Sequence, residues 1–104
     1  MENIFVENEE EYIKRKEKEE FKKIIKEKLK KGLYTIAIRS SDLKNEYYFV
    51  RPNIKFEVLA EEFKAKNPNK KCYFLFQGKK VDEKRTLEEL NIKHLSVIIT
   101  AEYI

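Results

Sequence analysis

Few side chains in this sequence could do chemistry on their own. Its 104 residues include one histidine, His94, and one cysteine, Cys72, whereas a zinc site of the usual kind needs several such ligands. The two glycines, Gly32 and Gly78, are too few for a loop that cradles nucleotide phosphates. We therefore expect no metal site, no cofactor and no catalytic residue, and we interpret the chain as a binding protein rather than an enzyme.

The two reactive side chains have simpler structural interpretations. Cys72 alternates with Phe74 and Phe76, so a strand at these residues turns the thiol inward, as a buried structural group rather than a nucleophile. His94 lies in a polar link before the last predicted strand, which favours a surface residue over a catalytic base.

Composition restricts the partners. The net charge is only +4, because 23 basic and 19 acidic residues are interspersed. This charge pattern is weak evidence for nucleic-acid binding. Nucleic-acid binding stays an alternative and would show a steep salt dependence. The lysines that would contact the phosphates are Lys22, Lys23, Lys28, Lys30 and Lys31. No apolar run approaches the roughly 20 residues of a membrane span, so we expect no membrane partner. The single cysteine and the lack of a secretory signal favour a cytoplasmic or nuclear location.

A long charged helix is predicted at the N-terminus. Asn8 can cap its start, with Glu11 placed for a capping box, and Gly32 is a natural C-cap after a lysine-rich last turn. The expected helix spans residues 9–30. Since the composition changes at Gly32, we divide the chain into a helical extension, 1–31, and a compact domain, 32–104.

Downstream of Gly32 the hydrophobic pattern alternates. It predicts strands at 33–39, with Tyr34, Ile36 and Ile38 on one face, and at 46–51; a hairpin is their simplest pairing. Phe56, Leu59, Ala60 and Phe63 then recur at helical spacing and predict an amphipathic helix that ends at Asn67 and Pro68. Further strands follow at 72–76 and, with Val97 and Ile99 inward, at 96–101; Leu87, Leu90 and Ile92 suggest a short helical turn between them. The order is β-β-α-β-β after an added helix.

Two stretches in this domain match a known pattern. Phe74–Val81 and Arg85–Ile92 resemble the part of ubiquitin and SUMO in which a core strand, a glycine-containing turn and a Thr-Leu short helix follow at this spacing. The resemblance covers about residues 33–101. It implies an α+β fold, the ubiquitin-like β-grasp, with a mixed sheet wrapped on one helix and the first and last strands parallel.

The resemblance also implies protein binding. Modifiers of this family are attached to targets through a C-terminal Gly-Gly, whereas this sequence finishes Ala101–Ile104. We therefore interpret the chain, as written, as a non-conjugating SUMO-like interaction module for a protein partner. The alternative is a conjugated modifier whose glycine tail is missing from this chain.

Two binding surfaces follow from the resemblance. In SUMO-like proteins a peptide adds beside the second strand, in a groove next to the helix, a mode that uses a free strand edge; the matching positions here are Tyr48, Val50, Arg51, Leu59 and Phe63. Partners of ubiquitin use the open sheet face. The positions expected on that face are Tyr47, Phe49, Leu75, Ile98 and Thr100.

The expected open face is larger and more apolar than a monomer usually exposes. We hypothesise that the N-terminal helix folds back over it, with Phe21, Ile24, Ile25 and Leu29 against the sheet. The main alternative is a homodimer formed through the N-terminal helix and the same surfaces.

Overall fold

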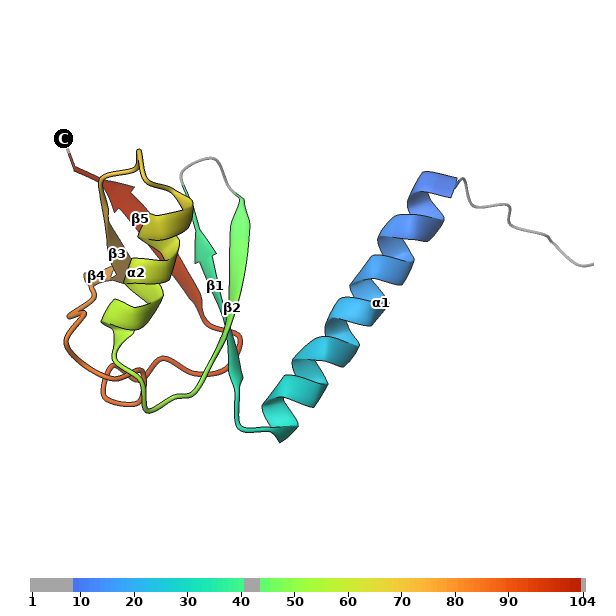
Figure 1. Cartoon of the computed structure of the whole chain (residues 1–104), viewed down its shortest axis with the longest axis horizontal. Helices are drawn as coiled ribbons and strands as arrows, with labels where there is room; N and C mark the ends of the chain where they lie inside the picture. The colour runs from blue at the N-terminus through green and yellow to red at the C-terminus, as the bar shows by residue number, and fades with distance from the viewer. Residues whose placement is uncertain (1–8, 41–43, 104) are drawn as a thin grey trace, which may run out of the picture.

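The computed structural model describes residues 9–40 and 44–103, with side chains from residue 17 onward. A five-stranded sheet separates two helices, α2 on one face and α1 on the other (Figure 1). In chain order the elements are α1 (Glu9–Lys30), β1 (Tyr34–Arg39), β2 (Asn45–Val50), α2 (Phe56–Lys66), β3 (Cys72–Phe76), β4 (Lys79–Lys80) and β5 (Val97–Glu102). This confirms the predicted α+β β-grasp and adds the two-residue strand β4.

The strands lie in the order β2-β1-β5-β3-β4. β1 pairs antiparallel with β2 and parallel with β5, where Ile38 lies opposite Ile98. β3 pairs antiparallel with β5 and with β4. The parallel contact between the first and last strands, which the resemblance implied, is therefore present.

The core lies between α2 and the sheet. Phe56, Leu59, Ala60 and Phe63 form the buried stripe of α2. The Phe74 ring of β3 meets the rings of Phe56 and Phe63 edge-on, with centroids 5.2 and 5.7 Å away. Since full burial of such a side chain contributes roughly 1.5–3 kcal/mol, these contacts are the main stabilisation of α2 on the sheet.

The start of α2 is capped by backbone rather than by its own side chain. Its N-cap residue, Lys55, makes no side-chain capping bond. Instead the amides of Phe56 and Glu57 donate to the carbonyl oxygens of Arg85 and Glu83, at 2.9 and 2.8 Å. The segment between β4 and β5 therefore satisfies amides that a helix start leaves without partners.

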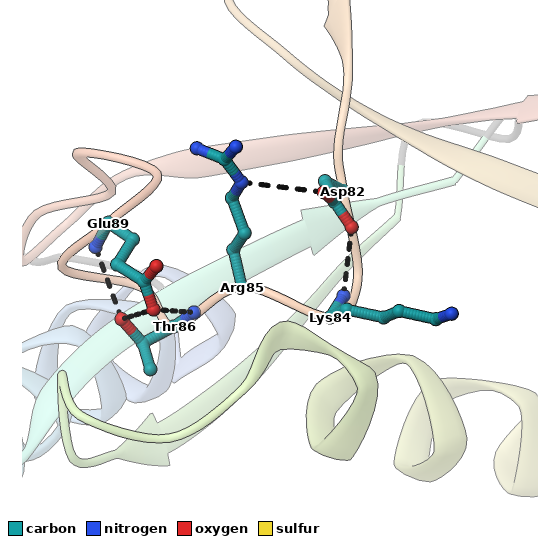
Figure 2. A network of polar contacts seen from close by, with 5 residues as sticks. All are labelled: Asp82, Lys84, Arg85, Thr86 and Glu89. Atoms are coloured by element: carbon teal, nitrogen blue, oxygen red, sulfur yellow. Dashed lines mark hydrogen bonds and ion pairs between the residues drawn. The ribbon is translucent and has the colours of Figure 1, made fainter.

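That segment is held by a capping box (Figure 2). The Glu89 amide donates to Thr86 Oγ1 at 3.2 Å, while the Thr86 amide and hydroxyl donate to Glu89 Oε1 at 3.2 and 3.0 Å. The short helical turn predicted here is a run of hydrogen-bonded turns rather than a helix. The predicted core contacts are present, with Leu87 and Ile92 buried and Leu90 packed against the core.

A Schellman motif ends α1. The Gly32 amide donates to the Leu29 carbonyl and the Leu33 amide to the Lys28 carbonyl, both at 2.9 Å. Gly32 has a φ of +82°, a value that glycine adopts without strain. The C-cap prediction is confirmed, whereas the N-cap, Asn8, lies outside the described residues.

Candidate protein-interaction surface

The outer face of the sheet, away from α2, has a half that α1 covers. The Phe21 ring lies 4.7 Å from the Tyr47 ring between centroids, and Lys28 Nζ lies 5.8 Å from the centroid of Phe49. Beside them Thr35 and Ala37 point outward from β1 yet are buried. The predicted packing of α1 on the sheet is thus present over β2 and β1.

The contact is narrower than predicted. Ile25 faces the sheet and lines a cavity of about 100 Å³ together with residues that include Ala37 and Val97. Ile24 and Leu29, each 42% exposed, lie on opposite flanks of the packed stripe. The expected contact to Ile98 does not form, because Ile98 is buried on the inner side of the sheet. The described contacts of α1 lie over β2, β1 and the start of β5, and its N-terminal half stands away from the sheet (Figure 1).

The predicted phase of β5 is wrong. Ile98 and Thr100 were expected on the open face, but they are 0% and 8% exposed and belong to the inner side. Val97 and Ile99, expected inside, are 39% and 49% exposed. The cause is the run of apolar residues at 97–99, which has no alternation; the pairing of Ile98 with Ile38 on β1 decides the phase.

An apolar surface remains over β5 and β3, and we call its outward side chains the open half: Tyr73, Leu75, Val97, Ile99 and Ala101. Leu75 lies beside Ile99, and Tyr73 beside Ala101. The Tyr73 ring packs 5.2 Å from the Tyr103 ring and carries Lys80 Nζ 5.5 Å from its centroid. Of the predicted face residues, Leu75 lies on the open half, while Tyr47 and Phe49 lie under or beside α1.

The predicted groove beside β2 is mostly core. Tyr48, Leu59 and Phe63 are buried, and Val50 packs against them, so only Arg51 of the five predicted residues is exposed. Four of the five side chains therefore serve the core in this structure, and the binding of a strand beside β2 stays a prediction. The physical reason is that alternation turns Tyr48 and Val50 toward α2, whose apolar stripe already fills that space.

Polar contacts join β2 to the C-terminal end of α2. Tyr48 donates a hydrogen bond of 2.7 Å to Glu46, which also accepts one of 3.1 Å from the Asn67 side chain at the end of α2. Lys66 Nζ lies 4.9 Å from the centroid of the Tyr48 ring. Burial, helped by the Glu46 carboxylate, raises the pKa of Tyr48 above its ordinary value, so the phenol remains a donor.

His94 has a structural role that sequence reasoning missed. Its Nδ1 atom accepts a hydrogen bond of 3.1 Å from the Thr35 amide, and the Leu95 amide donates to the Thr35 carbonyl at 2.8 Å. The ring also packs 5.9 Å from Tyr34. A half-buried histidine thus extends the β1–β5 pairing, where a surface residue was expected; its partner is 59 positions away, so no local pattern could reveal it.

The prediction for Cys72 is confirmed. The thiol is buried, and this burial raises its pKa, which keeps it protonated and poorly nucleophilic. Within the described ranges, no three His, Cys, Asp or Glu side chains are grouped closely enough to hold a metal ion. None of the helices in the same ranges has the length and apolar character needed to cross a membrane.

A charged cavity lies elsewhere. It measures about 640 Å³ and is lined by α2 and the segment from β4 onward, with Glu57, Glu61, Asp82 and Glu83 facing Lys64, Lys80 and Lys84 around Val81. Lys64 and Glu83 approach to 3.9 Å. The charged side chains of this cavity can pair with one another, and its lining has one apolar residue. This cavity is therefore a weaker candidate for partner binding than the open half.

Comparisons with known proteins agree with this architecture. The family model described as Ubiquitin-2 like Rad60 SUMO-like matches residues 34–99. Among solved structures, a de novo designed protein based on ubiquitin is similar, with a TM-score of 0.60 and 25% identity over 68% of this chain and 89% of that chain. A search of the curated proteins finds no match.

Proposed function

Because the chain belongs to the Ubiquitin-2 like Rad60 SUMO-like family, we propose that it is a protein-interaction module that binds a partner protein through the open half of its sheet. The role is non-enzymatic recognition in the cytoplasm or nucleus. The exposure of Val97 and Ile99, two aliphatic side chains next to each other on one strand face, is the observation that carries the proposal.

Three features support the open half over the other surfaces. Its aliphatic side chains are in register across two strands, Leu75 beside Ile99, so they form a continuous floor. Aromatic rings border the floor at one end, and such rings are enriched in protein interfaces. The region beside β2, by contrast, has its apolar side chains in the core.

The proposal concerns noncovalent binding. A conjugated modifier would need two adjacent glycines after β5, and the glycines of this sequence stand at positions 32 and 78. The coding sequence downstream of Ile104 separates the two roles: adjacent glycines encoded there would favour the conjugated modifier, and a stop codon there the binding module.

The test of the binding role uses two matched variants. Ile99→Glu places a charge on the open half, and Val58→Glu places the same charge on the outer side of α2, where Val58 is 46% exposed against 49% for Ile99. Proteins captured by the full chain should be lost with Ile99→Glu and kept with Val58→Glu. Equal capture by both variants would exclude the open half as the binding surface.

A homodimer through α1 is the rival use of these surfaces. Sedimentation of the full chain over a range of concentrations distinguishes it, because a self-associating face gives a mass that rises with concentration. A concentration-independent monomer mass is the result we expect.

A further inference from the structure

The structure fixes which flank of α1 faces the open half. Phe21 and Lys28 contact β2, whereas Ile25 lines a cavity that extends from Tyr47 of β2 across β1 to Val97 on the β5 side. Each residue of a helix is rotated about 100° around the helix axis from the one before it. The step from Phe21 and Lys28 to Ile25 around this axis is therefore a step from the β2 side toward the β5 side. Viewed along the helix axis, the side chains that lie about 60–140° from Phe21 on the Ile25 side point toward β5. These side chains are Lys18, Leu29, Lys22 and Lys26.

The two flanks of α1 differ in charge. The flank toward β5 carries Lys18, Lys22 and Lys26, one helical turn apart and all exposed. The opposite flank, toward β2, carries Glu17, Glu20 and Glu27 around Ile24. Of the two flanks, the basic one lies on the side of the open half, and its Lys22 and Lys26 belong to the C-terminal half of α1, which packs on the sheet.

The far side of the open half is also basic. Lys80 of β4 lies beside Leu75 and reaches over the Tyr73 ring. Arg39 of β1 lies beside Ile99 in the same outward row. The apolar floor thus has lysines on both sides and an arginine along one margin.

The space between these margins has the width of one helix. Neighbouring strands are about 4.8 Å apart and a helix with its side chains is about 10 Å across, so a helix covers about two strands. α1 covers β2 and β1, and the sheet order leaves β5 and β3 open before the β4 edge. The outer face already packs one helix of this chain, α1.

We propose that the open half, with the basic flank of α1 as its second wall, binds an amphipathic helix of a partner protein that has an apolar stripe and acidic residues on both sides of it. This rests on the proposed function and names the partner's chemistry. Under this proposal α1 stays on the sheet and selects acidic partners, and it does not have to dissociate for a partner to bind. Apolar burial on the floor supplies affinity, and the lysines supply selectivity and salt dependence.

The test compares two synthetic helical peptides on the full chain. Both carry the same leucine stripe, flanked in one by glutamates and in the other by lysines, and affinity is measured by fluorescence anisotropy. We expect the acidic peptide to bind at least about tenfold more tightly at low salt, with the difference shrinking at high salt. Amide chemical shifts that change on binding should include Val97 and Ile99.

A charge reversal with a matched control locates the selectivity. Lys22→Glu with Lys26→Glu changes the flank toward β5, whereas Lys23→Glu with Lys30→Glu makes the same charge change on the side of α1 that points away from the sheet. The first pair should abolish or reverse the preference for the acidic peptide, and the second should alter it far less. Circular dichroism of all variants checks that α1 remains helical.

The failures can be told apart. Equal affinity for both peptides, equal effects of the two lysine pairs, or no binding of the acidic peptide overturns the inference; if Ile99→Glu still removes captured partners, the proposed function stands. Three other results would also overturn the inference. Chemical-shift changes at β2 would assign another site, self-association lost with Ile99→Glu would assign a second copy of this chain, and tighter binding of a single-stranded oligonucleotide would assign nucleic acid. If Ile99→Glu changes neither capture nor peptide binding, both proposals fail.

Discussion

The two faces of the sheet are each covered by a helix, yet the two contacts differ in kind. On the inner face, α2 buries four apolar side chains completely against the sheet. On the outer face, α1 inserts Phe21 and Ile25, both only half-buried, and leaves Ile24 and Leu29 at 42% exposure. The inner contact is the hydrophobic core, whereas the outer one is a surface contact over two strands.

The inner face therefore carries the stability of the domain, and the outer face is free for recognition. A helix that supplies the core cannot change its buried side chains without a large loss of stability. A helix that lies on two strands by one aromatic pair and a few aliphatic contacts can vary its exposed residues at little cost. Substitutions on each face should therefore differ in their cost.

The inner face should respond most strongly. Phe74→Ala removes the ring that meets both Phe56 and Phe63, and such a cavity in the core costs about 3–5 kcal/mol. Urea unfolding followed by circular dichroism measures the loss. The matched outer change, Ile99→Ala, should cost less than about 1 kcal/mol; similar losses for the two variants would contradict the contrast between the faces.

Removal of α1 tests the outer face as a whole. Deleting residues 1–31 should leave the β-grasp folded but lower the free energy of unfolding by about 1–3 kcal/mol, because the half-buried contacts of Phe21 and Ile25 are lost. Tyr47, Ala37 and Thr35 become exposed, so the fluorescence of an apolar dye should rise. An unchanged melting curve and unchanged dye binding would show that α1 does not rest on the sheet in solution.

The segment that caps α2 should show an intermediate effect. Thr86→Ala removes the hydroxyl that exchanges hydrogen bonds with Glu89, and the loss of such a cap costs about 1 kcal/mol. Glu89→Gln is the control, since its amide oxygen can still accept from Thr86. If the two variants unfold at the same urea concentration, the capping box contributes nothing measurable.

The smallest effect is expected under α1, with the opposite sign. Thr35 Oγ1 is buried and has no hydrogen-bond partner among the described residues. Thr35→Val has nearly the same shape without the hydroxyl, so stability should stay equal or rise by up to about 1 kcal/mol. A clear loss of stability on urea unfolding would mean that this hydroxyl has a partner in solution.

The elements with a strong local pattern could be predicted from the sequence. The stripe from Phe56 to Phe63 predicted α2, and strict alternation at Cys72, Phe74 and Phe76 predicted both β3 and its inward face. Gly32 marked the end of α1 because few other residues adopt a positive φ without strain. In each case the signal lies within a few residues.

What could not be predicted depends on contacts between distant residues. The phase of β5 is set by its pairing with β1, since Val97, Ile98 and Ile99 are all apolar. The candidate site shifted for this reason: of the five residues predicted on the sheet face only Leu75 lies on the open half, and the groove residues are mostly core. The orientation of the lysine flank of α1 likewise depends on a tertiary contact, the cavity that Ile25 shares with Val97 of β5.

The Schellman motif at Gly32 has a consequence for how this surface could diversify. Two backbone hydrogen bonds help to set the direction in which α1 leaves β1, and they do not depend on which side chains the outer flanks carry. The lysines of the basic flank could be replaced by other residues without changing the orientation of α1 on the sheet. Partner preference could therefore drift by surface substitution alone, with the scaffold and its folding left unaltered.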